Sequence, residues 1–80
     1  MTENMLATDK QIKYLTDLTN KVNRIIDLWP ECGVEKFYTD WRHERSRGMN
    51  TNDASIKISA FKSLIRGINM KRVLFNLPQF

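Results

Sequence analysis

The fold is decided by residues 8–29, which read TDKQIKYLTDLTNKVNRIIDLW. Apolar side chains recur there at intervals of three and four positions, the spacing that gathers them on one face of an α-helix. Thr8 stands where an N-cap is expected, and Gln11 completes a T-x-x-Q capping box three residues later. Because Pro30 cannot continue a helix, we predict an amphipathic helix over residues 8–29. Its core face comprises Ile12, Leu15, Leu18, Val22, Ile25, Ile26 and Trp29.

A second helix is predicted after the turn PECGV, in which Gly33 can adopt the positive φ of a sharp reversal. Apolar residues follow at positions i, i+3, i+4 and i+7, which indicates about three turns of helix over residues 34–46. The residues that share this face are Val34, Phe37, Tyr38 and Trp41.

A third helix is predicted from the sequence NTND at residues 50–53, where Asn50 is the N-cap and Asp53 the reciprocal acidic residue. Gly67 is a candidate C-terminal stop, so we place this helix at residues 51–67. Its core face comprises Ala54, Ile58, Phe61, Leu64, Ile65 and Ile68.

These elements predict a compact all-α domain of three helices, with most of the core supplied by the first and third. Residues 1–7 show no periodicity and are expected to be a flexible lead-in, so residues 8–80 form a single helical domain. Residues 69–80 contain a β-prone centre and a proline, and the chain offers no obvious strand edge for them. We therefore expect an extended C-terminal tail packed across the helices. The alternative is a tail that crosses to a second copy and makes a homodimer.

The composition excludes several classes of protein. Eighty residues with 41% hydrophobic and 28% charged side chains are typical of a small soluble domain. No apolar run approaches the ~18 residues needed to span a bilayer, and the N-terminus lacks the pattern of a secretory signal. We expect an intracellular protein with no membrane partner.

The sequence also offers little for catalysis or metal binding. His43 is the only histidine and Cys32 the only cysteine, so one chain cannot assemble a zinc quartet or an H-x-x-x-H pair. The three glycines are far apart and form no phosphate-binding loop. We therefore expect no enzymatic activity, no metal and no cofactor, and we interpret Cys32 as a small apolar residue.

Positive charge is unevenly distributed along the chain, whose formal net charge is +4. Residues 1–41 hold five basic and seven acidic side chains, a balance of −2, whereas residues 42–80 hold eight basic and two acidic, a balance of +6. This asymmetry suggests an anionic partner, such as nucleic acid or an acidic protein surface. The candidate binding residues are Arg42, Arg45, Arg47, Lys57, Lys62, Arg66, Lys71 and Arg72.

Tyr38, Trp41 and Ile56 are candidate aromatic or apolar contacts to the same partner. Arginines beside aromatic rings are found in single-strand binding sites. In the alternative interpretation, Tyr38 and Trp41 belong to the core, and the arginines are a solvated helix end near the negative end of its dipole. Ile56 points away from the apolar stripe, so either the tail or a partner should cover it.

Two motifs resemble a known family. ATDKQIKYLTDL at residues 7–18 resembles the A-T-x-K-Q-I-x-Y-L/I-x-x-L opening of a small helical domain common in phage and prophage proteins. NTNDASIKISAF at residues 50–61 resembles its later motif, S/T-x-x-E-A-S-x-x-I-x-x-L. That domain occurs alone or appended to recombination and single-strand-annealing proteins. The resemblance implies a phage or mobile-element origin, work in the cytoplasm of a bacterial host and proximity to DNA-handling machinery, and it transfers no catalytic residue.

Two functional hypotheses follow. In the first, the chain is a non-catalytic phage or mobile-element accessory protein that binds nucleic acid through its basic C-terminal half. In the alternative, it is a protein-binding inhibitor or adaptor, such as an anti-CRISPR-like anti-defence factor that docks on a host nucleic-acid-processing complex.

Overall fold

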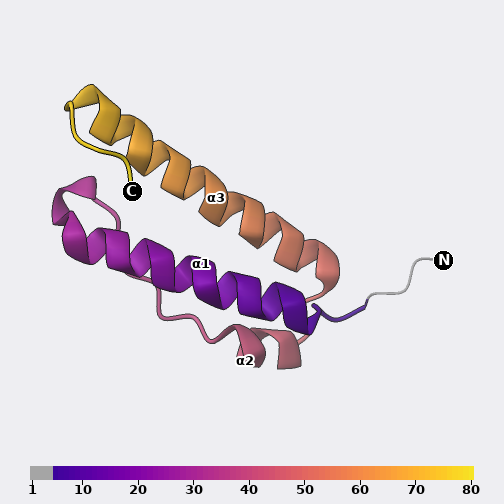
Figure 1. Ribbon diagram of the computed structural model, residues 1–80. Coiled ribbons are helices and arrows are strands. Elements are labelled where there is room, and N and C mark those ends of the chain that lie inside the picture. Colours follow the sequence, from indigo (N-terminus) through magenta and orange to yellow (C-terminus); the bar gives the residue numbers. More distant parts are fainter. Residues whose placement is uncertain (1–4) are drawn as a thin grey trace.

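Two long helices form the body of the molecule, as the computed structural model shows for residues 5–80, the part of the chain that it describes (Figure 1). The elements are α1 (Asp9–Leu28), the short 3-10 helix η1 (Pro30–Cys32), α2 (Trp41–Ser46) and α3 (Thr51–Leu74). In Figure 1, α1 lies between α3 on one side and α2 on the other. The prediction of a compact all-α domain is confirmed.

Both long helices begin at the capping boxes expected from the sequence. The Thr8 side chain accepts the Gln11 N–H at 3.1 Å, and the Gln11 side chain accepts the Thr8 N–H at 3.0 Å. Asn50 and Asp53 exchange the same pair of bonds at the start of α3. The predicted core face of α1 is also confirmed, because six of its seven residues are buried and Trp29 is half-buried.

α3 extends a further two turns beyond the predicted stop at Gly67 and ends at Leu74. A glycine inside a helix costs only about 1 kcal/mol relative to alanine, and the next residue, Ile68, is buried in the core. Tertiary packing therefore outweighs the local signal. The expectation of an extended tail from residue 69 is wrong for residues 69–74, and only residues 75–80 lie beyond the helix.

α1 and α3 run in the same direction (Figure 1). At their starts the Gln11 side-chain amide donates to the Thr51 carbonyl at 3.1 Å. At their ends the Arg72 guanidinium lies 5.1 Å from the centre of the Trp29 ring. Because the helices are parallel, the chain that joins them must return along the length of α1.

That return explains why the predicted helix over residues 34–46 is wrong in its first half. Residues 33–40, which we call the crossover segment, contain no helix, and α2 begins only at Trp41. Eight extended residues reach about 26 Å, whereas eight helical residues reach about 12 Å. Only the extended form covers most of the ~30 Å length of α1.

Side chains of α1 hold the crossover segment in place. The Asn23 side-chain oxygen accepts the Phe37 N–H at 2.8 Å, and the Asn23 amide donates to the Phe37 carbonyl at 2.7 Å. Lys36 forms an ion pair with Asp27, and this hydrogen bond raises the pKa of Lys36. Asn23 thus satisfies both main-chain groups of one residue in a segment that lacks a helix or sheet.

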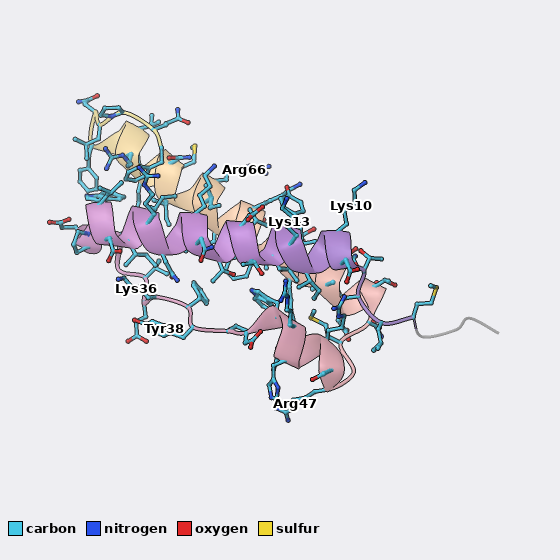
Figure 2. The ribbon with its side chains drawn as sticks, turned by 60° about the horizontal axis from the view of Figure 1, so that its bottom comes forward. Lys10, Lys13, Lys36, Tyr38, Arg47 and Arg66 are labelled. Atoms are coloured by element: carbon cyan, nitrogen blue, oxygen red, sulfur yellow. The ribbon has the colours of Figure 1, made fainter. Side chains whose placement is uncertain are left out.

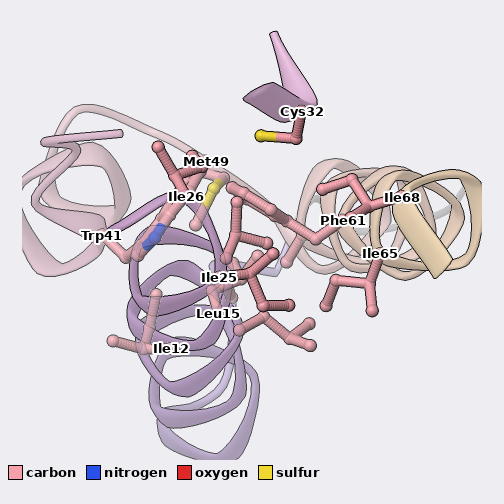
Figure 3. Packing of buried hydrophobic residues seen from close by; sticks show 14 residues of the cluster. Ile12, Leu15, Ile25, Ile26, Cys32, Trp41, Met49, Phe61, Ile65 and Ile68 are labelled. Atoms are coloured by element: carbon pink, nitrogen blue, oxygen red, sulfur yellow. The ribbon is translucent and has the colours of Figure 1, made fainter. Parts of the chain in front are cut away.

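The core lies between α1 and α3 and is closed from the side by α2 (Figure 3). Trp41 is buried, and its indole N–H donates to the Thr19 hydroxyl at 2.8 Å. Phe61 of α3 meets both Trp41 and Phe37 edge-on, with ring centres 5.9 and 5.1 Å apart. Cys32 is buried with these residues, as expected for a small apolar side chain.

The residues before α1 are partly fixed, in contrast to the expected flexible lead-in over residues 1–7. Residues 1–4 lie outside the described part of the chain. The Met5 carbonyl accepts a hydrogen bond from the Thr51 N–H at 2.9 Å, and the Ala7 N–H donates to the Met49 carbonyl at 3.0 Å. This short antiparallel bridge buries Ala7 and ties the start of α1 to the start of α3.

Candidate functional site

Arg45, one of the predicted binding residues, instead joins α2 to the start of α1. Its guanidinium lies 2.6 Å from the Asp9 carboxylate and also donates to the Ala7 carbonyl at 3.4 Å. The hydrogen bond from Arg45, and then its positive charge, hold the pKa of the Asp9 carboxyl below its usual value. Arg45 therefore has a partner within the molecule, the exposed Asp9 carboxylate.

Lys71 and Arg72 are likewise used inside the molecule. The Lys71 ammonium donates to the Cys32 carbonyl at 3.4 Å. The Arg72 guanidinium lies over two aromatic rings, 5.1 Å from the centre of Trp29 and 4.2 Å from that of Phe80. Lys71 thus joins the end of α3 to η1, and Arg72 joins it to Trp29 at the end of α1.

Arg42, Arg47 and Lys57 are exposed, but acidic side chains surround them. Arg47 and Lys57 line one shallow hollow, and Arg42 lines a groove between α1 and α2. The local charge is therefore mixed, which weakens attraction for an anionic partner. The acidic side chains that line the same two hollows are Asp9, Asp17, Asp40, Glu44 and Asp53.

The three predicted aromatic or apolar contacts differ in how far they are exposed to solvent. Trp41 is only 7% exposed, so its interpretation as a core residue is correct. Tyr38 is 86% exposed on the crossover segment, which corrects its interpretation as a core residue. Ile56 is 60% exposed, and the tail, which folds back at the opposite end of α3, does not cover it.

The remaining predicted cations, Lys62 and Arg66, lie beside lysines and an arginine of α1. The Lys62 ammonium is 5.2 Å from the centre of the Tyr14 ring, which places the two helices in contact on this side. Figure 2 shows Lys10, Lys13 and Arg66 on the side of the molecule away from Arg47. We define the basic face as Lys10, Lys13, Lys21, Arg24, Lys62 and Arg66.

Helical spacing keeps five of these cations in two neighbouring stripes, whereas Lys13 lines the groove between α1 and α2. On α1 the exposed stripe advances by alternate steps of four and three residues and includes Asp17 as its single acidic member. Ser55, Ser59, Lys62 and Arg66 repeat the same steps on α3. Because the helices are parallel, the stripes run alongside each other. The exposed stripe of α1 comprises Lys10, Tyr14, Asp17, Lys21 and Arg24.

The basic face accounts for the net positive charge of the protein. It holds six of the thirteen basic side chains. Asp17 lies within it, and Asp9 and Asp40 line the same groove as its Lys13. Apart from Asp17 and from Glu3, which lies outside the described residues, the chain holds seven acidic side chains, Asp9 and Asp40 included, and seven basic ones outside the basic face. The rest of the described molecule is therefore balanced in charge.

Four of these six cations were not predicted from the sequence as binding residues, because they precede the basic C-terminal half. The signal was present as the four-three spacing of basic residues on α1. That spacing alone is also typical of a solvated helix surface. Only the position of Lys62 and Arg66 beside it makes a two-helix surface.

A scan of the chain against protein-family models finds no match, and no curated protein or solved structure matches it. Within residues 5–80, none of the helices has the length and apolar character needed to cross a membrane. In the same part of the chain, no three histidine, cysteine or acidic side chains gather as metal ligands.

Proposed function

We propose that this chain is a non-catalytic nucleic-acid-binding protein that holds a phosphate backbone on the basic face. The observation that carries the proposal is the gathering of the whole charge excess on one side of α1 and α3. From Lys10 to Arg24 the face extends about 21 Å along α1. This length corresponds to about six base pairs of duplex, given 3.4 Å per step.

The chemistry of the face favours backbone contacts over recognition of bases. Lysine ammonium groups act as point charges for phosphate, and the serines of α3 can donate to phosphate oxygens. Tyr14 offers an aromatic ring on this face, but the Lys62 ammonium already lies near it. Phe80 lies at the edge of the face, in one hollow with Lys21 and Arg24. We therefore expect binding that depends strongly on salt and weakly on sequence.

The origin and cellular setting belong to the same proposal. The resemblance of two motifs to a phage helical domain supports an accessory protein of a phage or mobile element that acts in the host cytoplasm. Both motifs contain the capping boxes of α1 and α3, so they support a shared architecture more than a shared activity. Recombination genes beside the coding sequence would support this setting.

A pair of matched triple variants tests the basic face. The first carries Lys21→Gln, Arg24→Gln and Arg66→Gln. A plot of log K against log salt has a negative slope for such a protein. We expect the magnitude of this slope to decrease by roughly 0.9 for each phosphate contact that is lost, or by about 2.7 if all three contacts are lost. The measurement is fluorescence anisotropy of labelled duplex and single-stranded DNA and RNA between ~50 and 200 mM salt.

The control variant carries Arg42→Gln, Arg47→Gln and Lys57→Gln, which remove the same side-chain types and the same charge from the mixed-charge surface. We expect it to lose much less affinity. If the wild-type chain binds no nucleic acid at low salt, the proposal is wrong. If the two variants lose equal affinity, the basic face is not the binding site.

A second candidate function is docking on a host protein, as an inhibitor or adaptor would do. The observation that favours it is a shallow groove between the crossover segment and α3, lined by Phe37, Trp41 and Phe61. Tyr38 projects into solvent from the same crossover segment. A stoichiometric partner captured from nuclease-treated host lysate, and lost with Tyr38→Ala, would support this function.

A further inference from the structure

The end of the molecule where α1 and α3 finish carries a cluster of exposed apolar side chains. It combines the last turn of α1, the outer side of the last two turns of α3 and the tail. Leu74 is the most exposed member, at 79%. We define the C-terminal patch as Leu28, Met70, Val73, Leu74, Phe75, Leu77 and Phe80.

The C-terminal patch is an ordered surface, because hydrogen bonds fold the tail back on α3. The Phe80 N–H donates to the Asn69 side chain at 2.8 Å, and the Asn69 amide donates to the Phe80 carbonyl at 3.5 Å. The Leu77 N–H donates to the Arg72 carbonyl at 2.8 Å. Asn76 makes the reversal in the left-handed region, at φ 57°, a conformation that asparagine tolerates better than most residues.

Two cations near the C-terminal patch are held by contacts within the molecule. The Arg72 guanidinium lies between the Trp29 and Phe80 rings and donates to the Pro78 carbonyl. Lys71 is bonded to the Cys32 carbonyl. No acidic residue follows Asp53 in the sequence. Further charged side chains at the edge of the patch come from α1, where Asp17, Lys21 and Arg24 line the same hollow as Leu28 and Phe80.

The size of the patch matches half of a stable protein interface. Seven large apolar side chains at roughly 100 Å² each expose on the order of 700 Å², close to the ~800 Å² per partner of a standard interface. The largest apolar patch of an ordinary monomer is about 300–600 Å². The C-terminal patch is therefore near the upper end of what a monomer leaves in water.

We propose that two copies of this chain associate through their C-terminal patches in a two-fold symmetric dimer. Interfaces between identical chains are the more apolar class, and a two-fold contact needs only one self-complementary surface. All seven members of the patch are apolar, so the patch itself offers a polar partner no charged side chain. A second copy supplies an apolar surface of the same size.

The dimer would place two basic faces in one particle. Each protomer is 50 Å long, so two protomers joined at their ends present an extended cationic surface. A nucleic acid that spans both faces would then bind with avidity. This consequence rests on the proposed function, whereas the dimer itself does not.

Sedimentation equilibrium of the full chain tests the association directly. The sample is nuclease-treated and measured at micromolar concentrations in high salt, so bound nucleic acid does not contribute. We expect a monomer–dimer equilibrium for the wild type. A variant with Leu74→Glu and Phe75→Glu should dissociate at least roughly tenfold more readily, because it places charges at the centre of the interface.

The matched control is Ile56→Glu, which adds a charge to an exposed apolar position of α3 outside the patch. Circular dichroism verifies that each variant retains its helices. A wild-type chain that stays monomeric throughout, or an open series of larger species, would overturn the proposal. A dimer that survives the double substitution but dissociates when Ile56→Glu is introduced would also overturn the proposal. Loss of nucleic-acid binding with an intact dimer would contradict only the proposed function.

Discussion

Replacing Asn23 tests the claim that one side chain fixes the path of the crossover segment. Asn23 makes two short hydrogen bonds to the main chain of Phe37, at 2.7 and 2.8 Å, in a partly buried position. Each such bond contributes about 0.5–1.5 kcal/mol net, so Asn23→Ala should cost about 2 kcal/mol. An 80-residue domain has a free energy of unfolding of about 4–12 kcal/mol. One side chain therefore carries a sizeable share of the total stability.

Asn20→Ala is the matched control, because Asn20 is an exposed asparagine on the same helix. Both substitutions gain the same intrinsic helix propensity, so the difference between them isolates the Phe37 contacts. The assay is urea unfolding followed by circular dichroism. A difference of about 2 kcal/mol should also lower the melting temperature of the Asn23 variant by roughly 10–15 °C. A difference below about 0.5 kcal/mol would refute the assignment.

Asn23→Asp separates the two hydrogen bonds. At neutral pH the new carboxylate can still accept the Phe37 N–H, but its second oxygen faces the Phe37 carbonyl and cannot donate. When acid protonates the carboxyl group, the donor returns. We therefore expect the stability gap between this variant and the wild type to narrow as the pH falls. A gap that widens in acid would contradict the arrangement of donors described here.

Two further outcomes follow from the structure. Gly67→Ala should raise the free energy of unfolding by about 0.5–1 kcal/mol, because a Cβ at Gly67 meets nothing within 4 Å and helix propensity improves. Gly48→Ala should lower it, because φ is +114° there, and thermal unfolding of both variants checks the opposite signs. The Asp9–Arg45 contact lowers the pKa of Asp9 in the folded chain. The contact therefore stabilises the fold at pH values above the pKa of Asp9 in the unfolded chain, and this stabilisation is lost as the pH falls through the pKa of Asp9 in the folded chain. Asp9→Asn should reduce this acid dependence, and unchanged pH profiles of stability would show that the contact contributes nothing.

The local elements of the fold were predictable because their signals are local. Each capping box lies within four residues, and each apolar stripe follows from helical periodicity alone. Thr8, Gln11, Asn50 and Asp53 occupy the expected positions. The prediction failed at Gly67. There the weak local preference for a helix stop is outweighed by the burial of Ile68 in a core whose other members are far away in the sequence.

The candidate site was less predictable than the fold. Arg45, Lys71 and Arg72 are indistinguishable in sequence from free surface cations, yet each contacts a residue at least 36 positions away. Conversely, the lysines of α1 gain their significance from Lys62 and Arg66, which lie beside them only in three dimensions. The distribution of charge along the sequence therefore indicates a basic C-terminal half, whereas the distribution of charge on the folded surface indicates the basic face.

The sequence by itself determined where α1 and α3 begin and which sides of them enter the core, because caps and periodicity act over a few residues. Only the tertiary structure decided that α1 and α3 run parallel, and the form of the connection between them follows from that direction. A parallel pair needs a return path nearly as long as α1, so the crossover segment is extended and α2 is short. The same direction places the cations of α1 alongside those of α3. It also brings the C-terminal ends of both helices, with their exposed apolar side chains, to the same end of the molecule.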